Sequence, residues 1–159
     1  MIVDSLLEMA SAQSVAAAAS TALIGDVIDL GATPQDHGVG ETMYVVIRPT
    51  TEIITAGAAG TIKFQVVSDA QAAIATDGSA TVHLDTGTFV TDGTDANDAQ
   101  LKTTGTILVA TLPAGTSRAY ERYLGILCVV GTTEVTAGAI DAFITHDISA
   151  YTSYADGQN

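Results

Sequence analysis

Apolar and polar residues alternate along several short stretches of this chain, a pattern typical of β-strands with one face in a core. The clearest stretch is GTIKFQVVSD at residues 60–69, in which Ile62, Phe64 and Val66 alternate with polar residues. Further strands are predicted at residues 25–31, 42–49, 80–85 and 105–113. The strand that begins at residue 42 is expected to end at Pro49, because proline cannot donate a hydrogen bond to a neighbouring strand.

Two longer apolar runs lie within residues 120–147, on either side of a short threonine-rich turn that contains glycine. We predict that they pair with each other as a β-hairpin. The first run, 124–130, is apolar on both faces, which is unusual for a strand of a small antiparallel protein. Its second face is expected to be covered by a loop or arm of the chain, or to be buried in an oligomer interface.

The first 20 residues are rich in alanine and serine and predict less regular structure. At most one helical turn is expected near residues 4–9, with Asp4 as its N-cap, followed by an extended arm. Helical periodicity is scarce in the rest of the chain, and turn residues separate the strands. These patterns predict an all-β protein, a jelly-roll-like antiparallel β-sandwich with an extended N-terminal arm. Within this single domain we assign residues 1–31 to the arm and first strand, 32–150 to the sandwich body, and 151–159 to a C-terminal tail.

Composition narrows the classes of function. With 47% hydrophobic and 14% charged residues, the chain is expected to fold rather than to be disordered. Its net charge of −13 repels phosphate groups, so nucleic acids and anionic membranes are poor partners. No apolar run approaches the ~20 residues of a membrane span, and the opening residues lack a basic signal region. The chain is therefore expected to be soluble and made in the cytoplasm.

Candidate catalytic and metal-binding residues do not form known motifs. The acidic loop at 88–100, with Asp92, Asp95, Asn97 and Asp98, lacks the spacing of a calcium-binding loop. His37, His83 and His146 lie far apart in sequence, and His83 is expected to face the surface from a strand. Cys128 lies in the apolar run, where a reactive thiolate is disfavoured. We predict no metal, no cofactor and no enzymatic activity.

The order of several segments resembles a known family. The segments are DSLLEMASAQSVAAAASTALIGDVIDLG, GETMYVVI, ITAGAAGTIKFQVVSD and LPAGTSRAYERYLGILCVVGTTEVTAGAIDAFITHD. Together they resemble the capsid cement, or decoration, proteins of tailed bacteriophages, of the Bordetella phage cement protein type. The resemblance implies a jelly-roll-like homo-oligomer that sits on the outer surface of the phage head and clamps neighbouring major capsid subunits.

The partners expected from this resemblance are the major capsid protein and further copies of the chain, with a homodimer preferred to a trimer. The protein would be made in the host cytoplasm and then become part of the virion. As contact residues we select Ile2, Leu6 and Leu7 on the arm, and Tyr44 and Tyr123 near a strand face.

Two other functions stay open at this point. One is a phage tail or fibre accessory module that binds a host surface glycan; the scattered tyrosines and the absence of tryptophan argue against it. The other is a secreted adhesin-like domain, which the absence of a signal sequence disfavours.

Overall fold

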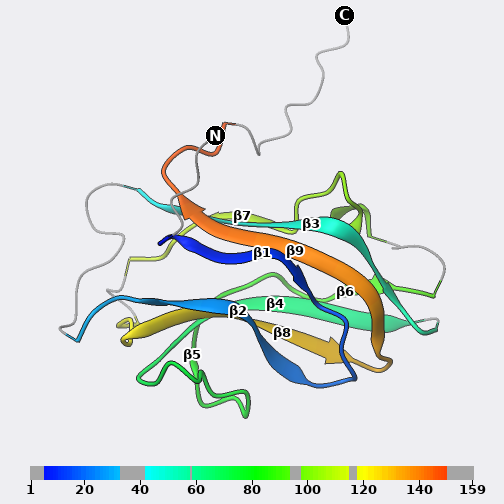
Figure 1. The fold of residues 1–159 in the computed structure, drawn as a ribbon, viewed down its shortest axis with the longest axis horizontal. Coiled ribbons are helices and arrows are strands. Elements are labelled where there is room, and N and C mark those ends of the chain that lie inside the picture. Colours follow the sequence, from blue (N-terminus) through cyan, green and yellow to red (C-terminus); the bar gives the residue numbers. More distant parts are fainter. Residues whose placement is uncertain (1–5, 33–41, 58, 94–97, 115–117, 150–159) are drawn as a thin grey trace, which may run out of the picture.

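The fold is a sandwich of two antiparallel sheets, seen in a computed structural model that describes residues 6–32, 42–57, 59–93, 98–114 and 118–149 (Figure 1). The first sheet has four strands in the order β1 (Glu8–Ser14), β9 (Val135–Thr145), β3 (Tyr44–Thr55) and β7 (Leu108–Thr111). The second sheet has the order β2 (Thr21–Asp29), β8 (Tyr123–Gly131), β4 (Gly60–Asp69) and β5 (Thr81–Asp85), and β6 (Phe89–Thr91) also pairs with β4. A short 3-10 helix, Ala99–Leu101, lies between β6 and β7.

The chain crosses repeatedly from one sheet to the other. Strands β1 and β2, β3 and β4, and β8 and β9 are neighbours in sequence but belong to opposite sheets. This alternation gives a jelly roll, so the predicted all-β sandwich is confirmed. The helical turn expected near residues 4–9 is wrong in its described part, because Leu6 and Leu7 are not helical and strand β1 begins at Glu8. The expected arm that follows is in part this same strand, at the edge of the first sheet. Leu6 and Leu7 lie in a turn and a bend before it, and residues 1–5 lie outside the described residues.

The predicted hairpin at residues 120–147 is wrong. Strand β8 lies between β2 and β4 in the second sheet, whereas β9 lies between β1 and β3 in the first (Figure 1). The three residues between them, 132–134, carry the chain across the sandwich. Two apolar runs joined by a short turn have the same local pattern in a hairpin and in a crossing of this kind. Only the long-range pairing of β8 with β4 and of β9 with β3 distinguishes the two arrangements.

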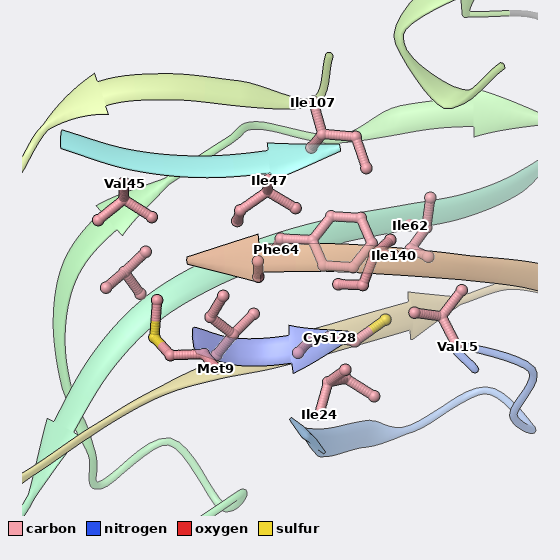
Figure 2. Packing of buried hydrophobic residues seen from close by; sticks show 14 of the residues in the cluster. Met9, Val15, Ile24, Val45, Ile47, Ile62, Phe64, Ile107, Cys128 and Ile140 are labelled. Carbon is pink, nitrogen blue, oxygen red and sulfur yellow. The ribbon is translucent and has the colours of Figure 1, made fainter. Parts of the chain in front are cut away.

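The main core fills the space between the sheets mostly with aliphatic side chains, together with the aromatic rings of Phe64 and Tyr120. Phe64 of β4 is fully buried and packs among residues such as Ile47 of β3 and Ile140 of β9 (Figure 2). Cys128 of β8 is part of this cluster, and its burial raises the pKa of the thiol to about 12. The thiolate is therefore disfavoured, as its position in the apolar run predicted.

A second, smaller core answers the question raised by the doubly apolar strand β8. Leu127, on the outer face of β8, packs with Val67 of β4 and with Ile74 and Ala80 of the loop between β4 and β5. At Gly125 the packing is so close that an added Cβ would lie 2.7 Å from Cδ1 of Ile74. The second face of β8 is thus covered, at these positions, by a loop of the same chain.

The covering loop is held by the last residue of β4. The Asp69 carboxylate accepts a hydrogen bond from the backbone N–H of Gln71 at 3.1 Å and another from that of Ala75 at 2.9 Å. These bonds satisfy backbone donors on both sides of Ile74 and fix its position. An aspartate at the end of a central, largely buried strand therefore completes a hydrophobic cluster.

Strand β3 continues beyond Pro49 to Thr55, so its predicted end is wrong. The missing N–H is tolerated because the pairing of β3 with β7 ends at Ile47, and the pairing with β9 shifts in register after Pro49. Proline thus marks an irregularity of the strand rather than its end.

The sheet edges are short or irregular. Strand β1 has a register shift on each side of Ala10, the second of which includes Ala12 with a φ of +45°, and β2 has one between Ile24 and Ile28. Strand β5 has a register shift at His83, and β7 has only four residues. Within the register shift of β2, Gly25 has a φ of +69° and lies so close to the carbonyl oxygen of Met9 that a side chain at residue 25 would collide with this oxygen. This glycine lets β1 and β2 meet across the side of the sandwich.

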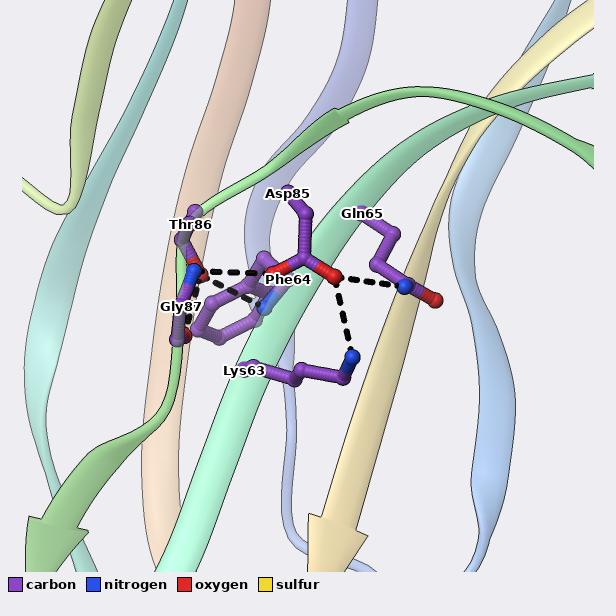
Figure 3. A network of polar contacts seen from close by, with 6 residues as sticks. All are labelled: Lys63, Phe64, Gln65, Asp85, Thr86 and Gly87. Carbon is purple, nitrogen blue, oxygen red and sulfur yellow. Dashed lines mark hydrogen bonds and ion pairs between the residues drawn. The ribbon is translucent and has the colours of Figure 1, made fainter.

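The turn after β5 is anchored on β4 by a polar network (Figure 3). The Asp85 carboxylate accepts hydrogen bonds from Lys63 Nζ at 2.9 Å, Gln65 Nε2 at 2.7 Å and the Gly87 N–H at 2.8 Å. Burial alone would raise the pKa of Asp85, but these donors outweigh it and the pKa is lowered. Thr86 adds a backbone and a side-chain hydrogen bond to β4. The polar side chains of Lys63, Gln65 and Asp85 on the second sheet are therefore used to hold the fold.

Candidate interaction end of the sandwich

Four of the five predicted contact residues lie at one end of the sandwich, which we call the tyrosine end. Tyr44 begins β3 and Tyr123 begins β8. The carbonyl oxygen of Leu7 accepts a hydrogen bond from Ile144 near the end of β9, which places Leu6 and Leu7 at the same end. Ile2 lies outside the described residues.

The two tyrosines do not form a single aromatic surface. Their neighbours in sequence, Val45 and Leu124, point into the main core. Because successive side chains of a strand point to opposite faces, Tyr44 and Tyr123 point outward from opposite sheets. The tyrosine end therefore presents one ring on each side of the sandwich.

Leucines 6 and 7 differ in their surroundings. Leu6 is 78% exposed, a large value for an apolar side chain of this size. Leu7 is half-buried and lines an apolar pocket of about 210 Å³, which we call the end pocket. Its other walls are Ile28, Asp29, Leu30, Met43, Leu112, Tyr120, Leu124 and Ile144. This pocket could not be predicted from the sequence, because its walls come from the ends of six segments that only the fold brings together.

An ion pair holds the strands together at the tyrosine end. Arg122 donates to both carboxylate oxygens of Asp29, from Nε at 3.0 Å and from Nη2 at 2.8 Å. Together with a hydrogen bond from the backbone of Gly31, this lowers the pKa of Asp29 to about 2. The same guanidinium lies 5.0 Å from the centre of the Tyr123 ring, within the range of a cation–π contact. Arg122 therefore fixes both the end of β2 and the orientation of Tyr123.

A second group of polar side chains surrounds His83, which the sequence predicted to face the surface. Instead, its ring is half-buried and stacks on Tyr120, with 4.0 Å between ring centres. The register shift in β5 leaves the His83 backbone without a paired residue on β4, so the regular alternation that underlies the prediction does not hold. Ser68 Oγ lies 2.8 Å from His83 Nε2 and accepts a hydrogen bond from the Glu121 N–H.

The Ser68–His83 contact resembles part of a catalytic arrangement only in its distance. Ser68 is fully buried and its oxygen accepts a hydrogen bond from the Glu121 N–H, so this side chain holds neighbouring segments together and is not exposed to a substrate. Burial and the positive charge of Arg118 lower the pKa of His83, although Glu121 acts in the opposite direction. His146, which the sequence placed beside Asp147, makes its contact from Nδ1 to the carbonyl oxygen of Thr42 at 3.2 Å.

A pocket of about 250 Å³, which we call the His83 pocket, lies beside the His83 ring. Its walls include His83, Val82, Pro113, Ala114 and Arg118. It lies between β5 and the segment that leads from β7 to β8. Tyr120 separates it from the end pocket, since its ring lines the end pocket and stacks on His83, while its hydroxyl donates to the Pro113 carbonyl oxygen at 2.6 Å. Burial raises the pKa of Tyr120 to about 12, so this bond persists over the neutral pH range.

In the part of the chain that the structure describes, no three histidine, cysteine, aspartate or glutamate side chains are gathered closely enough to hold a metal ion. Of the acidic loop residues, Asp95 and Asn97 lie outside the described residues, while Asp98 accepts a hydrogen bond from the Val90 N–H. None of the helical structure in these residues has the length and apolar character that crossing a membrane requires.

Acidic residues far outnumber the basic residues that could pair with them. Of the five lysine and arginine residues of the chain, Arg48, Lys63 and Arg122 form ion pairs with Asp141, Asp85 and Asp29. Eighteen acidic residues share these few cations. Much of the negative charge is therefore left to face the solvent or a partner.

Comparison with known proteins relates this chain to one protein family. The family model Bbp16 matches residues 9–144, which include all nine strands except the first residue of β1 and the last of β9. No match was found among the curated proteins.

Proposed function

Because the chain belongs to the Bbp16 family, a family of Bordetella phage proteins, we propose that it is a capsid cement protein. In this role it binds the outer surface of the phage head and clamps neighbouring major capsid subunits against the pressure of the packaged DNA. The protein is made in the host cytoplasm and becomes part of the virion. Its partners are the major capsid protein and another copy of itself, as a dimer rather than a trimer.

The observation that carries the proposal, beyond the family, is the tyrosine end. It combines an exposed leucine, an apolar pocket beside it, and strand ends fixed by the Arg122–Asp29 ion pair. An exposed apolar group on a rigid support is typical of a protein contact surface, because little ordering is needed on binding. The role is mechanical and requires no catalytic residue.

The clamp works through several weak contacts made at once. Once one contact to the shell has formed, the others form at a high effective concentration, because the sandwich holds them at fixed separations. A rigid body with two sheets tied by a common core transmits a pulling force from one bound subunit to the next. The negative surface favours basic patches on the shell, so binding should weaken as salt is added.

Co-sedimentation with expanded phage heads that lack the protein tests this proposal. Purified protein is added at increasing concentration, and the bound amount is measured relative to the major capsid protein. Saturation at a fixed ratio supports the clamp, and the ratio distinguishes dimers from trimers on the head. If the protein stays in the supernatant at both low and physiological salt, the cement function is wrong.

Two matched variants locate the contact. Leu6 at the tyrosine end and Val90 of β6 at the opposite end are both exposed large apolar residues. Leu6→Asp should weaken head binding by about tenfold or more. A tenfold loss corresponds to ~1.4 kcal/mol of binding free energy, which is the contribution of a modest contact residue. Val90→Asp introduces the same charge and should leave binding within about twofold. Equal losses in both variants would remove the tyrosine end from the proposal.

The alternative function, binding of a host surface glycan, predicts a different outcome. Glycan sites commonly use aromatic rings side by side, whereas Tyr44 and Tyr123 point outward from opposite sheets. Binding to a glycan array, combined with no binding to heads, would favour this alternative.

A further inference from the structure

The His83 pocket differs from its surroundings in the sign of its charge. Arg118 forms one wall and donates from Nη1 to the carbonyl oxygen of Val82 at 3.0 Å. This bond fixes the guanidinium at the mouth of the pocket but uses one of its five N–H donors. A positive group with further donor capacity thus lies beside a hollow in a protein of net charge −13.

Hydrogen bonding also positions the His83 ring. Ser68 Oγ accepts the Glu121 N–H and lies within hydrogen-bond distance, 2.8 Å, of His83 Nε2. A neutral imidazole has one N–H donor and one acceptor nitrogen. Burial and the charge of Arg118 lower the pKa of His83 and so favour the neutral ring, although Glu121 acts in the opposite direction.

The remaining walls, Val82, Pro113 and Ala114, are apolar side chains. The pocket therefore offers a cationic fork and an imidazole ring beside a small apolar surface, in about 250 Å³. This combination matches a carboxylate at the end of a short apolar stem. A bidentate pairing of a guanidinium with a carboxylate is the geometry that arginine favours.

We propose that the His83 pocket binds the carboxylate of an aspartate or glutamate side chain from a protein partner. A monovalent carboxylate suits the site better than phosphate, because the −13 charge of the chain repels a dianion more strongly. The methylene groups of the acidic side chain contact Pro113 and Ala114, while its oxygens meet Arg118.

On the phage head, the partner is the major capsid protein; this part of the inference rests on the proposed function. An acidic side chain on the shell is repelled by most of this protein's surface and attracted at the His83 pocket. The contact thereby selects one orientation of the protein on the shell, because attraction at one place and repulsion elsewhere together give specificity. Basic patches on the shell supply attraction over the rest of the surface.

The binding of a small probe tests the site without phage heads. Capped glutamate, the N-acetyl amide of the amino acid, is titrated into the purified protein while NMR follows the ring signals of His83. We expect saturable shifts with a Kd of about 1–10 mM, typical of one exposed ion pair with partial burial. Capped glutamine, which has the same shape without the charge, should give no saturable shift.

Two arginine variants make the test specific. Arg118→Gln should weaken probe binding by about tenfold or more, whereas Arg48→Gln, which removes a cation paired with Asp141 on the first sheet, should leave it unchanged. A dispersed NMR spectrum confirms that each variant is folded. Unchanged binding in Arg118→Gln, equal binding of capped glutamine, or tighter binding of inorganic phosphate would overturn the proposal.

The two proposals fail separately. A protein that binds the probe but not heads retains the carboxylate site and refutes the cement function. A protein that binds heads but not the probe retains the cement function and refutes the carboxylate site.

Discussion

The close contact between Gly125 and Ile74 gives a quantitative prediction about the second core. A Cβ at residue 125 would lie 2.7 Å from Cδ1 of Ile74 and 3.2 Å from methyl groups of Leu23 and Val27. Gly125→Ala therefore overpacks the cluster, which costs about 1–3 kcal/mol. Alanine is better than glycine in a strand by roughly 0.5–1 kcal/mol, so the expected net loss of unfolding free energy is about 0.5–2 kcal/mol.

The variant Ile74→Val removes the atom that lies nearest to the added Cβ. Alone, it should cost about 0.5–1.5 kcal/mol, the usual value for this change in a core. In the double variant the new methyl group occupies the space that Cδ1 leaves. The combined loss should thus fall short of the sum of the single losses by about 0.5–1.5 kcal/mol, the size of coupling seen between residues in contact.

Urea unfolding of the wild type, the two single variants and the double variant measures this coupling. Ile62→Val provides the matched control, because Ile62 is fully buried in the main core and pairs with Val130, five residues along β8 from Gly125. That separation is about 16 Å, so its effect should add to that of Gly125→Ala within about 0.5 kcal/mol. Strict additivity in the Ile74 pair would show that the loop does not cover β8 as described.

Three further predictions concern the edges and the tyrosine end. In Arg122→Gln the pKa of Asp29 should rise from about 2 toward its ordinary 3.8, measured by NMR titration. Because this pKa is depressed in the folded state, the ion pair stabilises the fold above about pH 4 and loses its effect as the pH falls toward 2, so the variant should lose less stability over that interval. The Asp141 carboxylate accepts a hydrogen bond from the Ala12 N–H at 2.8 Å and forms an ion pair with Arg48. Hydrogen exchange at the Ala12 N–H should therefore accelerate about tenfold or more in Asp141→Ala. It should accelerate less in Asp141→Asn, which keeps an acceptor oxygen. Equal acceleration in both variants would contradict this role of the side chain. Gly25→Ala should lower the Tm by about 5 °C or more, because a left-handed φ alone costs an alanine about 1–2 kcal/mol and the added Cβ also collides with β1. An unchanged Tm would show that stability does not depend on the close approach of β1 and β2.

Strands whose side chains alternate between a core and a polar face were predicted well from the sequence. Residues 60–69 form β4 with the expected inward side chains, because one buried face imposes a period of two. Strand β5 was found at 81–85, close to its predicted position, but the side-chain direction of His83 was missed. A register shift changes the phase of the alternation, and nothing in the local sequence marks it.

Pairing between strands could not be predicted in the same way. The apolar faces of β8 and β9 are compatible with a hairpin or with membership of opposite sheets. The choice depends on their pairing with β4 and β3, which lie more than 50 residues earlier in the chain. The candidate site shows the same limit. Leu6, Leu7, Tyr44 and Tyr123 were selected from the sequence, but the end pocket and the Arg122–Asp29 pair exist only because distant segments meet there.

The irregular sheet edges have a consequence for the proposed cement function, in which many copies lie side by side on one head. A long, regular edge strand offers an uninterrupted row of N–H and C=O groups to the edge of another copy, which is how fibrils and swapped strands grow. Here the register shifts in β1, β2 and β5 interrupt that row, and β7 is only four residues long. Crowded copies thus lack a template for continuous strand pairing, so each can stay a discrete particle while lying close to the next.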